Sequence, residues 1–147
     1  MLEIGSRWGS LSLHIAWHMV DVQINMIMLS NNQCVHMCVE VVWHGFKDRI
    51  HMHLLDYCKM LQEWDGMFDH VVSVEMIEAV RRDNMEVYWA AVNHVLKKKN
   101  ATGVIQGITI PKACQSSFPP NITVLIHMTE SLFQPFTLQD SMIIPSR

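Results

Sequence analysis

The sequence predicts a single α+β domain spanning residues 1–147, with an antiparallel or mixed sheet that begins with a β-hairpin at about residues 20–43. Amphipathic helices at about residues 46–64 and 84–99 are expected to pack on one face of this sheet. Two observations predict this fold class: strand-like alternation in the first half, and helix-like spacing later on. The alternative is an all-α bundle.

The hairpin follows from two stretches in which apolar and polar residues alternate, at residues 20–28 and 35–43. Between them, Asn31 and Asn32 tolerate the left-handed backbone of a tight turn. With the turn placed there, the five facing pairs on one side of the hairpin are all apolar. The pairs are Met28 with Val35, Met26 with Met37, Ile24 with Val39, Val22 with Val41, and Val20 with Trp43.

The segment before the hairpin is open to two interpretations. Residues 1–10 are expected to be a loose lead-in, because Gly5 and Gly9 interrupt them. Residues 11–19 alternate like a strand that joins the next one at a β-bulge. The competing interpretation makes residues 8–30 a helix, since Leu11, Ile15 and Met19 also recur at helical spacing.

The later elements are marked by apolar spacing and by breakers. Apolar residues recur every three or four positions from Phe46 to Trp64, and Asp65-Gly66 follows as a stop signal. The helix at 84–99 ends in three lysines, where the helix dipole favours positive charge. Strands are expected within residues 71–80, 104–110 and 122–128.

Composition limits the partners and the compartment. The net charge of −3 gives no reason to expect nucleic acid, and the 17% of charged residues is below the usual value of about 25%. No apolar run approaches the roughly 20 residues of a membrane span. No export signal is expected, so the four cysteines are interpreted as reduced thiols in the cytoplasm.

The best candidate for catalysis is a group formed by His44, Asp48 and His51, which would share one helix face if a helix began early enough. A solvated helix face is the simpler interpretation, because Gly45 interrupts that helix. The chain lacks the P-loop, the Gly-x-Gly-x-x-Gly pattern and the nucleophile elbow. No cofactor and no metal are therefore predicted.

The second face of the hairpin is the candidate interface. It would carry Ile27, Leu29, Cys34 and Val42. The chain is rich in methionine, with 12 Met residues and also 5 Trp, and such flexible or aromatic side chains suit binding surfaces.

These features favour a non-catalytic protein-protein interaction module over an enzyme. The expected state is a homo-oligomer, or a subunit of another protein assembly, that uses an apolar Met- and Trp-rich interface. The alternative is a small-molecule-binding protein or enzyme with a Met-lined cavity for a small apolar ligand and the His/Asp group. A third interpretation is an engineered or unselected sequence without an evolved function.

Overall fold

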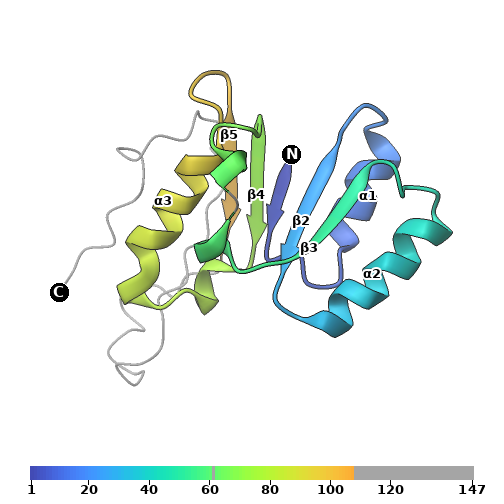
Figure 1. Ribbon diagram of the computed structural model, residues 1–147, viewed down its shortest axis with the longest axis horizontal. Helices are drawn as coiled ribbons and strands as arrows, with labels where there is room; N and C mark the ends of the chain where they lie inside the picture. The colour runs from blue at the N-terminus through green and yellow to red at the C-terminus, as the bar shows by residue number, and fades with distance from the viewer. Residues whose placement is uncertain (61, 108–147) are drawn as a thin grey trace.

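The computed structural model describes residues 1–60 and 62–107, in which strands and helices alternate (Figure 1). The strands are β1 (Leu2–Ile4), β2 (Ile24–Met28), β3 (Ile50–Leu54), β4 (His70–Val74) and β5 (Thr102–Gln106). The α-helices are α1 (Ser10–His18), α2 (Asn31–Trp43) and α3 (Met85–Val95). Short 3-10 helices are η1 (Tyr57–Lys59), η2 (Gln62–Trp64), η3 (Ile77–Ala79) and η4 (Arg82–Asn84).

The five strands form one sheet in the order β3-β2-β1-β4-β5, and every neighbouring pair is parallel. Helices α1 and α2 lie on one side of the sheet and α3 on the other (Figure 1). Parallel strands need crossover connections, and helices in those connections cover both faces. The predicted antiparallel or mixed sheet is therefore wrong, and so is the all-α bundle.

The hairpin is wrong because its second half is helix α2. The hydroxyl of Ser30 accepts a hydrogen bond from the Gln33 N–H at 3.4 Å, which caps the start of this helix. Met37 and Val41, one helical turn apart, are buried, while Val39 is 61% exposed. In the second half of the predicted hairpin, three of the five residues expected to point inward are thus exposed: Val35, Val39 and Trp43.

Helix α2 ends at Gly45, which has φ 73°. The Gly45 N–H donates to the Val42 carbonyl at 3.1 Å, and the Phe46 N–H donates to the Val41 carbonyl at 2.8 Å. These two bonds form a Schellman motif, in which a left-handed residue closes a helix. Gly45 therefore closes a helix and does not follow the second strand of a hairpin.

Two more elements differ from the prediction. Residues 46–64 do not form one helix, since they contain β3 followed by η1 and η2. Residues 11–19 fall largely within α1, which buries Ser12 and Ala16 at a spacing of four. For this segment the competing helical interpretation describes the structure.

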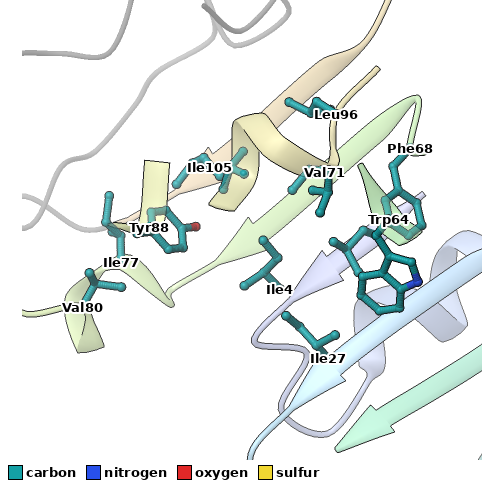
Figure 2. Close-up of a cluster of buried hydrophobic side chains, with 13 residues drawn as sticks. Ile4, Ile27, Trp64, Phe68, Val71, Ile77, Val80, Tyr88, Leu96 and Ile105 are labelled. Carbon is teal, nitrogen blue, oxygen red and sulfur yellow. The ribbon is translucent and has the colours of Figure 1, made fainter. Parts of the chain in front are cut away.

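Two apolar cores lie on the two faces of the sheet. On the first face, side chains of β1 and β4 pack against α3, with Ile4, Val71 and Tyr88 fully buried (Figure 2). On the other face, β2 side chains Ile24 and Met26 pack against α1 and α2. Strand β2 contributes to both cores, because Ile27 points into the first one. Burial on both faces is typical of a strand inside a parallel sheet.

The later predictions agree with the structure in part. Helix α3 falls within the range predicted as helical, and β4 and β5 overlap the strands predicted at 71–80 and 104–110. The strand predicted at 122–128 lies outside the described residues. Among the described residues, no helix combines the length and apolar character needed to cross a membrane. A single domain for the whole chain stays a prediction.

Candidate functional site

The turn between β1 and α1, residues 5–9, contains two glycines with positive φ and is bonded to the central part of the sheet. The N–H groups of Gly5 and Ser6 both donate to the carbonyl of Ile27, at 3.1 and 3.2 Å, which ties the turn to β2. Gly5 has φ 77°, and a Cβ there would lie 2.9 Å from the sulfur of Met76. Gly9 has φ 72°, and a Cβ there would overlap the buried side chain of Met37. A side chain at either position would be strained by the positive φ and would displace a packed methionine.

Glu3 supports this turn from inside the sheet. Its carboxylate accepts a hydrogen bond from the Ser12 hydroxyl, and its backbone carbonyl accepts one from the Ser6 hydroxyl at 3.1 Å. Burial raises the pKa of the Glu3 carboxyl, and the hydrogen bonds from Ser12 and Ser6 oppose that rise. Glu3 therefore connects the turn to α1 but costs stability when it is ionised.

Replacing Glu3 by glutamine should change how stability depends on pH. Because the pKa of Glu3 is higher in the folded state, the folded protein holds the extra proton and loses stability as pH rises through that pKa. Glutamine keeps an acceptor for Ser12 but has no proton to lose. In urea denaturation, the free energy of unfolding of Glu3→Gln relative to the unmodified protein should rise as the pH increases above 4.5, the ordinary pKa of a glutamate. A difference that is independent of pH would contradict this.

A pocket of about 240 Å³ opens at the carboxyl ends of β1, β2 and β4. The turn after β1 forms one wall with Gly5 and Arg7. The segment after β2 forms a second wall. Residues that follow β3 and β4 form the remaining walls. The lining residues that carry polar side chains are Arg7, Ser30, Gln33, Tyr57 and Glu75.

The pocket's place in the sheet has a functional meaning. From β1 the chain passes through α1 to β2 on one side, and it later returns from β3 to β4 on the other side of β1. Ligands of open parallel sheets bind at such a switch point, outside the carboxyl ends of the strands. The turn after the first strand approaches the ligand there, and this chain has Gly5 and Gly9 in that turn.

The wall after β2 differs from the usual dinucleotide pattern, in which an acidic side chain binds the ribose. Residues 28–33 contain no Asp or Glu. Ser30 and Gln33 line the pocket instead, and they offer a hydroxyl and a carboxamide. Across from them, burial and then the neighbouring Cys58 raise the pKa of Tyr57 to about 12, so its phenol stays protonated at neutral pH.

The catalytic candidates from the sequence lie away from this pocket. His44 caps the end of α2 and lies 3.4 Å from the Glu40 carboxylate. Asp48 is in the connection to β3, and His51 is near the amino end of β3, opposite the carboxyl ends that form the pocket. Within residues 1–60 and 62–107, no three His, Cys, Asp or Glu side chains are grouped to hold a metal ion. A catalytic role for these residues stays a prediction.

The four interface candidates do not share one surface. Ile27 is buried in the core beneath α3, whereas Leu29 and Val42 are exposed and Cys34 is half-buried. Leu29 lies at the rim of the pocket, and Val42 lies on α2. Association through the exposed members of this set remains a prediction.

The site residues were missed because residues 1–10 were interpreted as a loose lead-in. The available signal was a short apolar strand, Leu2 to Ile4, followed at once by two glycines four residues apart and then by a helix. The dinucleotide pattern itself is absent because, counted from Gly5, Arg7 and Ser10 occupy the positions of its second and third glycines.

The five-stranded parallel sheet and its switch-point pocket define a Rossmann-like domain. A solved structure of a putative S-adenosyl-L-methionine-dependent methyltransferase from Methanococcus maripaludis shares this fold, with a TM-score of 0.65 and 22% identity. That similarity covers 79% of this chain and 51% of the other. The profile of the mycolic acid cyclopropane synthetase family matches residues 1–130, and the chain belongs to that family.

Two relatives agree with this assignment. The tuberculostearic acid methyltransferase UfaA1 of Mycobacterium tuberculosis is 36% identical over 111 residues, which are 76% of this chain and 24% of that protein. A probable fatty acid methyltransferase of Pseudomonas putida is 35% identical over 88 residues, 60% of this chain and 22% of that protein. The chain thus spans about a quarter of the length of these relatives.

These findings correct the predicted function. The non-catalytic interaction module is wrong, because the family and both relatives are named for enzymes. The alternative of an enzyme with a ligand cavity was the better interpretation. The pocket at the switch point is lined by none of His44, Asp48 and His51. Membership of a natural family also contradicts the interpretation of the chain as an unselected sequence.

Proposed function

We propose that this chain is the cofactor-binding region of an S-adenosylmethionine-dependent methyltransferase that modifies the acyl chains of lipids. The observation that carries the proposal is the pocket at the carboxyl ends of β1, β2 and β4, walled by the turn that contains Gly5 and Gly9. The lipid substrate is supported by the two relatives, whose names refer to fatty acids.

The residues present fit an adenosyl compound. Ser30 and Gln33 would hold the ribose hydroxyls, because a hydroxyl and a carboxamide both donate and accept hydrogen bonds. The exposed side chain of Leu29 would cover the base. When bound, S-adenosylmethionine supplies an electrophilic methyl group. The chain's own task is to bind and orient that molecule, and Glu3 and Gly9 contribute by fixing the turn.

Two measurements test the proposal. Isothermal titration of the chain with S-adenosylhomocysteine should give a dissociation constant between about 1 μM and 1 mM, the range usual for enzyme substrates. With S-adenosylmethionine labelled in its methyl group and phospholipids that carry unsaturated acyl chains, label should appear in the extracted lipid. Absence of S-adenosylhomocysteine binding would overturn the proposal, and label transferred only to water-soluble acceptors would overturn the choice of substrate.

Replacing Gln33 by alanine should weaken S-adenosylhomocysteine binding about three- to tenfold, the loss expected for one hydrogen bond. The matched control is Asn32→Ala, in the same first turn of α2 but exposed and outside the pocket. Titration calorimetry of both variants measures the difference. Equal affinities of the two variants for S-adenosylhomocysteine would show that Gln33 does not contact the ligand.

A cytoplasmic location also remains a prediction. It is supported by Cys34, Cys38 and Cys58, which are free thiols. The fourth cysteine, Cys114, lies outside the described residues.

A further inference from the structure

Two residues of opposite charge face each other at one end of the pocket. Arg7 comes from the turn after β1 and Glu75 from the end of β4, and both line the pocket. The Arg7 Nη1 lies 3.5 Å from the Glu75 Oε2. The pair therefore spans the switch point between the two strands.

Both residues have a left-handed backbone, which costs about 1 to 2 kcal/mol for a residue other than glycine. Arg7 has φ 50° and Glu75 has φ 51°, and in the described part of the chain only Asn100 is a further non-glycine residue with positive φ. Such strain in folded proteins is concentrated at functional sites. Two strained residues on opposite walls of one pocket are therefore candidates for a role in ligand binding.

The contact between the side chains does not by itself explain this strain. The Arg7 side chain is 67% exposed and that of Glu75 is 42% exposed, so water screens the pair. Exposed ion pairs contribute little to stability, on the order of 0 to 1 kcal/mol. The two charges therefore remain available to a ligand that carries both signs.

We infer that Arg7 and Glu75 recognise the α-amino-carboxylate end of the cofactor. The Arg7 guanidinium binds the carboxylate, since its planar fork matches that group, and the Glu75 carboxylate binds the ammonium. This inference rests on the proposed function. It makes Arg7, which occupies the position of a glycine in the dinucleotide pattern, responsible for the preference for a ligand with a carboxylate. It also gives the pocket an orientation, with the amino-acid end at β1 and β4 and the ribose at Ser30.

Titration calorimetry with three ligands tests the inference. The ligands are S-adenosylhomocysteine, its decarboxylated analogue, which keeps the amine, and 5′-methylthioadenosine, which lacks both charged groups. The unmodified chain should bind S-adenosylhomocysteine about tenfold more tightly than the decarboxylated analogue, the preference expected for one charge-assisted hydrogen bond. Arg7→Met should reduce this ratio to about one and leave 5′-methylthioadenosine binding unchanged, whereas Arg7→Lys should keep part of the ratio.

Arg7→Gly keeps the test independent of folding, because glycine relieves the strain at φ 50°. This variant should melt at or above the temperature of the unmodified chain and still lose the carboxylate preference. Glu75→Gln should weaken binding of the decarboxylated analogue, which keeps the amine, but not of 5′-methylthioadenosine.

The inference is overturned if Arg7→Gly tightens binding of all three ligands equally, since Arg7 would then only narrow the pocket. An unchanged ratio in Arg7→Met overturns it as well. In both cases S-adenosylhomocysteine still binds and the proposed function stands. If none of the three ligands binds the unmodified chain, the proposed function fails and the inference fails with it.

Discussion

Replacing Val41 by aspartate should cost more than about 4 kcal/mol of stability, enough to unfold a domain of this size, because it places an unpaired charge in a closed core. Val41 is 2% exposed and packs with Met37 between α2 and the sheet. Val39, two residues earlier on the same helix, is 61% exposed. Val39→Asp should therefore change stability by no more than about 0.5 kcal/mol.

Urea denaturation followed by circular dichroism measures both variants. The comparison also separates the two interpretations of residues 35–43. In the hairpin, Val39 and Val41 would face the same core, and their replacements would be equally severe. In α2 the two side chains lie on different faces of the helix, so a large difference is expected. Comparable losses would contradict the helix.

Replacing Gly9 by alanine should cost about 2 to 5 kcal/mol, for two separate reasons. The left-handed backbone, with φ 72°, contributes about 1 to 2 kcal/mol. The new Cβ would also overlap the buried side chain of Met37 and lie 3.0 Å from the Cε of Met26, and overpacking of this kind costs about 1 to 3 kcal/mol.

Gly45→Ala is the matched control for this substitution. Gly45 has nearly the same backbone angle, φ 73°, but a Cβ there would meet nothing within 4 Å. Its replacement isolates the cost of the left-handed conformation at about 1 to 2 kcal/mol. Gly9→Ala should also weaken S-adenosylhomocysteine binding, because the turn forms a wall of the pocket, while Gly45→Ala should not. Equal stability losses would mean that the turn after β1 is not closely packed on α2.

One ambiguity in the sequence explains the two main errors of fold prediction. Residues four positions apart share a face both in a helix and in a strand. Met37 and Val41 fit a strand by this spacing but lie in α2, and Ile50 and Leu54 fit a helix but lie in β3. Valines at positions 35, 39, 41 and 42 strengthened the wrong choice, since β-branched residues favour strands.

Local stop and start signals would have resolved this ambiguity. Ser30 caps α2, and Gly45 closes it. A serine before the apolar run and a glycine after it are the usual signature of a helix, not of a strand. By contrast, α3 was placed close to its true range because its apolar residues fit only the helical period.

The pocket was harder to predict, because it depends on the sheet order. Arg7, Ser30 and Glu75 are far apart in the sequence and meet only when β1 lies between β2 and β4. With an antiparallel sheet in mind, there was no reason to place these three residues at the same pocket. The left-handed conformation of Arg7 also has no signal in the sequence, since glycine is the residue expected there.

The central claim is that the pocket at the carboxyl ends of β1, β2 and β4 binds the adenosyl cofactor. Amide chemical shifts of the isotopically labelled chain, recorded during titration with S-adenosylhomocysteine, test it most directly. The largest shifts should fall at residues 5–9, 28–33 and 75–79, which surround the pocket. Shifts gathered instead around His44, Asp48 and His51, at the opposite end of the strands, would contradict the claim.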